Sequence, residues 1–170
     1  AERIDANMMD VSMQDLRDLS KSMYTDRIQK IQNKVDGRLI VKEYPTATAH
    51  AGHFRALLEE LKLKQNFYPD IIFIDYLNIC VSQRLRNNAG ANSYTIVKAI
   101  AEELRGLAVE YDLPIVSATQ TTRGGFNNSD VDLTDTSESF GLPATADLMF
   151  ALISTEELEQ QGHMMVKQLK

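Results

Sequence analysis

The stretch Ile71-Ile-Phe-Ile-Asp75 decides the fold that we expect for this chain. An apolar run that ends in a carboxylate is typical of a parallel strand buried on both faces. Pro114 to Thr119 reads as a second buried strand, and apolar residues recur at helical spacing over residues 94–111 between the two. A strand, a helix of crossover length and a strand form a right-handed unit. The sequence therefore predicts an α/β fold with an open, mostly parallel sheet flanked by helices.

Further elements are expected on both sides of this unit. Before it, the patterns predict one or two helices over residues 11–35 with a capping start at Ser12, a strand over residues 38–44, and a helix over residues 49–64. After it, they predict polar loops over residues 82–93 and 121–134, strands Leu148–Ile153 and Met164–Leu169, and a short helix near residues 156–160.

Composition limits the class of protein. Hydrophobic residues make up 44% of the 170 positions and charged residues 25%, which is typical of a soluble globular domain. The net charge is −6, so no overall positive field attracts nucleic acid, and any DNA contact must be local. The apolar runs are strand-sized and no secretion signal leads the chain, so we expect an intracellular protein without a membrane span. Cys80 is the single cysteine, which excludes an internal disulfide.

Two strand ends carry candidate chemistry. Asp75 follows the first strand at the sheet edge where a Mg²⁺-nucleotide binds in such folds, which is the arrangement of a Walker B motif. An aspartate also ends many ordinary strands as a helix or turn cap, so this motif alone leaves both interpretations open. Gln120 ends the neighbouring strand, where its amide is suited to sensing a γ-phosphate, although polar residues also begin ordinary loops.

Other signals are missing or weak. The sequence contains no G-x-x-x-x-G-K-[ST] run, which excludes a complete P-loop ATPase. The abrupt start at Ala1 and the end at Lys170 suggest an excerpt of a longer protein. His50 and His53 lie three residues apart on one helix, but no nearby Cys or acidic residue completes a metal site there.

Three segments resemble the DnaB-like hexameric replicative helicases. Ile74-Asp-Tyr-Leu77 is similar to that family's Asp-Tyr-Leu Walker B motif. Residues 98–123 are similar to its helix-strand-Gln segment with a trailing Arg. Residues 129–147 are similar to its last motif, and their sequence is typical of the helicases of T-even-like phages. The resemblance is strong over residues 70–170 and thinner before them, where only Arg3-Ile-Asp5 is similar.

This resemblance implies that residues 1–170 are a partial RecA-like motor domain, truncated at both ends and lacking its phosphate-loop portion. It implies ATP and Mg²⁺ as cofactors, with Asp75 as the Mg²⁺-linked acid and Gln120 as the residue that couples nucleotide state to the DNA loops. The residues implied for contact with single-stranded DNA are Arg84, Arg86, Arg123, Ser137, Glu138, Ser139 and Phe140.

Two further positions are informative through the resemblance. Ser137 and Phe140 stand where bacterial relatives have Arg and Gly, so a phosphate contact there would use backbone N–H groups. Lys170 resembles the Lys that precedes the family's arginine finger. The phosphate loop, catalytic glutamate and arginine finger all fall outside residues 1–170, so we expect this fragment alone to have no ATPase activity.

The resemblance implies a part of an ATP-dependent replicative helicase that unwinds duplex DNA at the phage replication fork by translocating on single-stranded DNA. The implied partners are five further copies in a homo-hexamer, a primase and a helicase loader, in the cytoplasm of the host cell. A RecA-like recombinase-type ATPase and a non-catalytic RecA-like interaction domain are the alternatives. The sequence of residues 141–147 argues against the recombinase-type ATPase. A phosphate loop encoded directly upstream of Ala1 would exclude the non-catalytic interaction domain.

Overall fold

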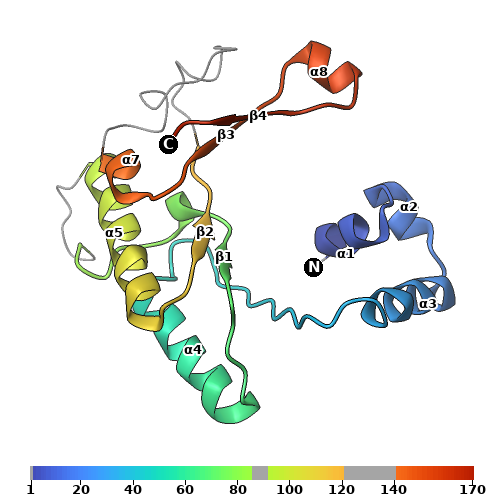
Figure 1. Ribbon diagram of the computed structural model, residues 1–170, viewed down its shortest axis with the longest axis horizontal. Coiled ribbons are helices and arrows are strands. Elements are labelled where there is room, and N and C mark those ends of the chain that lie inside the picture. Colours follow the sequence, from blue (N-terminus) through green and yellow to red (C-terminus); the bar gives the residue numbers. More distant parts are fainter. Residues whose placement is uncertain (1, 86–91, 121–140) are drawn as a thin grey trace. The chain divides into compact units, whose positions relative to one another are not determined.

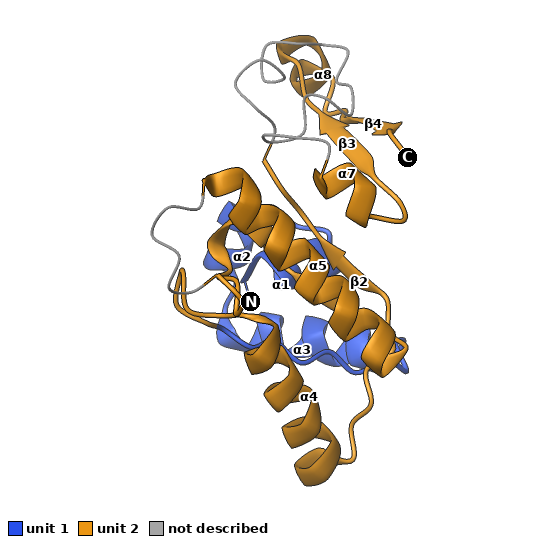
Figure 2. Ribbon diagram, turned by 90° about the vertical axis from the view of Figure 1, so that its left-hand side faces the viewer, with its two compact units in different colours: residues 1–43 blue, residues 44–170 orange. Residues whose placement is uncertain are grey.

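The computed structural model describes residues 2–85, 92–120 and 141–170. The chain divides into two compact units, residues 1–43 and 44–170 (Figure 2). That residues 1–170 form one motor domain stays a prediction. Among the described residues, no helix is long and apolar enough to span a membrane.

The first unit consists of three short helices, α1 (Glu2–Met9), α2 (Met13–Asp18) and α3 (Lys21–Gln32). Ser12 caps α2, because its Oγ accepts a hydrogen bond from the Asp15 backbone N–H over 3.0 Å. The predicted helices and the predicted capping start at Ser12 are thus confirmed, whereas α1 was not predicted.

The strand predicted over residues 38–44 is wrong, because these residues form neither helix nor strand. A strand is held by hydrogen bonds to a neighbouring strand. In the described part of the chain, every strand pairs elsewhere: β1 with β2 and β3 with β4. Alternating apolar and polar residues therefore did not suffice, since no partner strand is available beside this segment.

The second unit alternates helices and strands in the predicted order (Figure 1). Its elements are α4 (Ala51–Gln65), β1 (Ile72–Ile74), η1 (Leu77–Ile79), α5 (Ser93–Tyr111), β2 (Ile115–Ser117), α7 (Gly141–Thr145), β3 (Phe150–Ile153), α8 (Glu156–Gln160) and β4 (Met165–Gln168). β1 and β2 pair in parallel, with Ile74 opposite Ser117, as the crossover pattern predicts. β3 and β4 pair with each other in an antiparallel hairpin around α8.

The core of this unit lies between α5 and one face of the β1–β2 pair. Ile100 and Leu104 of α5 are 2% and 4% exposed, and Ile74 and Ile115 pack against the same cluster. The prediction that the strands are buried on both faces is wrong: Phe73 of β1, opposite Val116 in the register, is 68% exposed. Among the described residues of this unit, helices pack on one face of the pair only.

The short helix α7, which was not predicted, packs tightly against α5. A Cβ atom at Gly141 would lie 2.8 Å from the Tyr94 hydroxyl and 2.9 Å from Lys98 Cδ, so a larger residue would require these side chains to move. Arg105 of α5 donates to the Thr145 carbonyl over 2.8 Å and pairs with Asp147 over 2.7 Å. Sterics and ionic contacts therefore fix α7 on α5.

Candidate functional site

The parallel pairing of β1 and β2 brings the two candidate residues to the same edge of the sheet. Asp75 follows β1 directly, and Gln120 lies three residues beyond the end of β2. Both residues are exposed. The C-terminal ends of neighbouring parallel strands are where ligands bind in open α/β sheets.

Hydrogen bonds connect these two strand ends. The Leu77 N–H donates to the Ala118 carbonyl over 3.0 Å, so backbone pairing continues past the strands. Beyond it, the Gln120 side-chain amide donates to the Tyr76 hydroxyl over 3.2 Å. Tyr76 directly follows Asp75 in the sequence, so the residue beside Asp75 contacts Gln120.

The surroundings of Asp75 suit a metal bound together with a nucleotide. In the described ranges, no Lys, Arg or His lies within ion-pair distance of its carboxylate. Nor do these residues contain a group of three His, Cys, Asp or Glu side chains that could hold a metal. Mg²⁺ in nucleotide sites is bound by one or two carboxylates, substrate phosphates and water. A single exposed carboxylate fits that chemistry, whereas a closed protein cage would need more ligands.

Arg84, one of the residues implied for DNA contact, lies against α5. One guanidinium nitrogen, Nη2, is 2.6 Å from a carboxylate oxygen of Glu102 and 3.2 Å from the Ala99 carbonyl oxygen. Nε lies 3.4 Å from Glu103. Its role toward DNA stays a prediction, and a phosphate would have to share this guanidinium with the two carboxylates.

Glu103 of α5 accepts several hydrogen bonds from the segment that includes Arg84. Its carboxylate accepts from the Ser82 hydroxyl over 2.6 Å, and from the backbone N–H groups of Gln83 over 2.9 Å and Arg84 over 3.1 Å. Burial by itself raises the pKa of Glu103, but these hydrogen bonds and the Arg84 side chain outweigh it, so that the net pKa is lowered. Sequence reasoning missed Glu103, because its partners lie 19 to 21 residues away.

The six other candidates for DNA contact, Arg86, Arg123, Ser137, Glu138, Ser139 and Phe140, lie outside the described residues. Lys170, which resembles the Lys before the family's arginine finger, donates from its ammonium group to the carbonyls of Pro143 over 2.9 Å and Ala146 over 2.7 Å. These contacts bind the end of the chain to the C-terminal end of α7.

His50 and His53 form the start of α4. His50 Nδ1 accepts from the Gly52 N–H over 3.1 Å, and His53 Nδ1 accepts from the His50 N–H over 3.3 Å. This is a reciprocal capping box. Both Nδ1 atoms are engaged with backbone donors, so these bonds give the pair a structural role.

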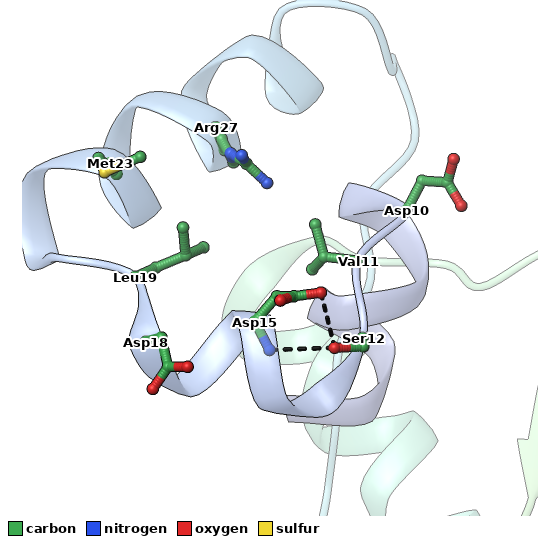
Figure 3. A pocket seen from close by; sticks show the side chains of 8 residues that line it. All are labelled: Asp10, Val11, Ser12, Asp15, Asp18, Leu19, Met23 and Arg27. Carbon is green, nitrogen blue, oxygen red and sulfur yellow. Dashed lines mark hydrogen bonds between the residues drawn. The ribbon is translucent and has the colours of Figure 1, made fainter.

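The first unit contains a shallow hollow at the junction of its helices (Figure 3). It is lined by Asp10, Val11, Ser12, Asp15, Asp18, Leu19, Met23 and Arg27. The Ser12 hydroxyl and the Asp15 carboxylate are 2.7 Å apart and belong to the start of α2. None of the predicted site residues lines this hollow.

Comparisons with known proteins cover nearly the whole chain. The family model of the DnaB-like helicase C-terminal domain matches residues 1–168. A DnaB-like replicative helicase of Enterobacteria phage T4 is 53% identical over 173 residues, which is the whole of this chain and 36% of that protein. A probable plasmid replicative DNA helicase of Chlamydia muridarum is 39% identical over 61 residues, 36% of this chain and 12% of that protein. This chain thus spans about a third of the phage relative's length.

Two solved structures share the fold at low sequence identity. One, an ATPase domain, matches with a TM-score of 0.72 and 16% identity, over 94% of this chain and 56% of that chain. The other, a DnaB-like replicative helicase described with its interactions with primase, also gives 0.72, at 18% identity over 94% of this chain and 38% of that chain. The expected RecA-like α/β fold class and the phage-type resemblance are confirmed. The chain belongs to the family of DnaB-like helicase C-terminal domains.

Proposed function

We propose that this chain is part of an ATP-dependent replicative DNA helicase, which unwinds duplex DNA by translocating on one strand at the phage replication fork. One observation carries the proposal: within a chain of this family, the exposed Asp75 and Gln120 follow the C-terminal ends of two neighbouring parallel strands. This is the edge at which nucleotides bind in such sheets.

Each of the two residues has a proposed role. Asp75 holds Mg²⁺ directly or through water, and the metal supplies charge stabilisation to the phosphates of bound ATP. Gln120 lies where it can sense the γ-phosphate, and its hydrogen bond to Tyr76 connects it to the strand that carries Asp75. A change in nucleotide state would therefore affect both strand ends together.

The DNA contacts and partners belong to the same proposal. We propose that the segments after β1 and after Gln120 face single-stranded DNA, with basic and backbone groups meeting phosphates. The residues proposed for these contacts are Arg84, Arg86, Arg123, Ser137, Glu138, Ser139 and Phe140. The proposed assembly is a homo-hexamer that works with a primase and a helicase loader in the host cell cytoplasm.

The test is ATP hydrolysis by the full-length parent protein, with and without single-stranded DNA, in the wild type and in Asp75→Asn. Asparagine keeps the size of the side chain but removes the charge that would hold the metal, so turnover should be lost. Asp70→Asn is the matched control, because Asp70 is an exposed aspartate before the same strand. It should leave turnover unchanged.

Each outcome has a clear meaning. DNA-stimulated turnover that Asp75→Asn abolishes and Asp70→Asn preserves supports the helicase motor and the metal role. Equal turnover in all three proteins contradicts the role of Asp75. No turnover in the wild-type parent contradicts the motor itself and favours a non-catalytic interaction domain. Residues 1–170 alone should hydrolyse no ATP, since their sequence has no phosphate-binding loop.

A further inference from the structure

We propose that Glu103 is a positioning residue, which fixes the first residues of the segment after η1 on α5 and so determines how Arg84 is presented to single-stranded DNA. The inference rests on the proposed function, because it takes the segment after β1 to face DNA. Glu103 lies within residues 98–123, which resemble the family, but neither the sequence motifs nor the resemblance assigned it a role.

The hydrogen bonds of Glu103 define the contact. Its Oε1 accepts from the Ser82 hydroxyl over 2.6 Å and from the Arg84 backbone N–H over 3.1 Å, and its Oε2 accepts from the Gln83 N–H over 2.9 Å. The Ser82 hydroxyl in turn accepts from the Leu85 N–H over 3.1 Å. One carboxylate thus organises four consecutive residues.

Burial makes these bonds hard to replace with water. Ser82 is 3% exposed, and the Glu103 side chain is 10% exposed. A carboxylate in such surroundings depends on its donors, and backbone N–H groups that lose a charged acceptor must find another. These bonds therefore favour one conformation of residues 82–85 where they lie against α5.

The neighbouring Glu102 offers an internal comparison. Its side chain is 40% exposed and lies 2.6 Å from Nη2 of Arg84 and 3.8 Å from Nζ of Lys98. The backbone N–H groups of the described residues 83–85 donate to Glu103 and Ser82 instead of Glu102. Glu102 thus contacts the guanidinium, whereas Glu103 also holds the backbone that carries it.

The experiment uses the full-length parent and the substitution Glu103→Gln. Glutamine keeps the shape, but its NH₂ group cannot accept a hydrogen bond, so part of the network is lost. The measurements are ATP turnover at saturating single-stranded DNA and the DNA concentration that gives half-maximal stimulation. We expect the half-saturating concentration to rise about tenfold, and the saturated turnover to change by less than about twofold.

Two control variants separate anchoring from loss of charge. Glu102→Gln removes the adjacent charge, and Glu110→Gln removes one from the same helix, where it pairs with Arg55 over 2.6 Å. Glu110→Gln should leave the half-saturating concentration within about twofold of the wild type. Glu102→Gln removes a carboxylate that competes with phosphate for the Arg84 guanidinium, so it should leave that concentration unchanged or lower it. An equal rise in Glu102→Gln would overturn the inference in favour of a general charge effect.

Three further outcomes would also overturn the inference. An unchanged half-saturating concentration in Glu103→Gln contradicts the inference. If DNA still stimulates the wild type, the proposed function is not contradicted by this result. A fall in saturated turnover without a rise in the half-saturating concentration indicates a general role in folding. A wild-type parent that DNA does not stimulate contradicts the proposed function, and the inference fails with it.

Discussion

The Gln120 side-chain amide and the Tyr76 hydroxyl are joined by a hydrogen bond of 3.2 Å. The two residues follow neighbouring parallel strands, and Tyr76 is the residue directly after Asp75. In the proposed motor, this bond connects the residue that senses the nucleotide to the residue directly after the metal-linked acid. Both partners are accessible to solvent, so the bond contributes modestly, about 1 kcal/mol.

The first prediction concerns this bond. Tyr76→Phe removes the hydroxyl acceptor and keeps the ring, so Gln120 loses the connection. In the full-length parent, we expect the ratio of ATP turnover with single-stranded DNA to turnover without it to fall about fivefold, which corresponds to about 1 kcal/mol. Tyr68→Phe, at an exposed tyrosine before β1, should leave the ratio unchanged. An unaltered ratio in Tyr76→Phe would mean that the bond carries no coupling.

The second prediction concerns the core of the second unit. Leu107 of α5 is 1% exposed, and truncation to alanine leaves a cavity among packed side chains. We expect Leu107→Ala to lower the free energy of local opening by about 2–5 kcal/mol. Native-state hydrogen exchange of the α5 amides measures this quantity without requiring that the parent unfold in one step.

Val109 provides the matched control for this measurement. It lies two residues further along α5 and is 76% exposed. Val109→Ala should change the free energy of opening by no more than about 0.5 kcal/mol. Similar exchange rates in the two variants would contradict the assignment of the buried face of α5.

The third prediction concerns the start of α4. His50→Ala removes the Nδ1 acceptor of the Gly52 N–H, and should destabilise the first turn by about 1 kcal/mol. His50→Asn supplies a side-chain oxygen that can accept at the same place. Hydrogen exchange of the Gly52 amide should accelerate in the alanine variant and stay near the wild-type rate in the asparagine variant. Equal acceleration in both would show that His50 acts through its ring packing on His53, 3.9 Å away, and not as a cap.

Elements fixed by neighbouring residues were predictable from the sequence. Ser12 caps α2 through a residue three positions ahead, and residues 156–160 form the predicted short helix. That Asp75 and Gln120 lie at the same edge of the sheet was predictable, because each follows a strand and parallel pairing brings the ends of such strands together. In each of these cases, the signal lies within a few residues or follows from the pairing rule.

Features that depend on distant partners were not predictable. Residues 38–44 alternate like a strand but have no strand beside them among the described residues. Phe73 belongs to an apolar run, yet whether it is covered depends on which helices lie over its face of the sheet. Glu103 is one acidic residue in a charged helix, and only the folded chain brings residues 82–84 to it. Local sequence patterns do not predict these contacts, because each depends on residues that are distant in the sequence.

The fourth prediction concerns alkaline pH. Burial and the hydrogen bond of 2.8 Å that its hydroxyl donates to Glu59 raise the pKa of Tyr111 to about 12. An unperturbed tyrosine titrates at about 10, so the bond between α5 and α4 contributes fully below about pH 10 and is lost as the pH rises through about 12. Tyrosinate absorbance of the folded parent should contain a component with a pKa of about 12, and Tyr111→Phe should remove it. If the same component persists in that variant, another tyrosine is responsible and the contact with Glu59 does not protect Tyr111.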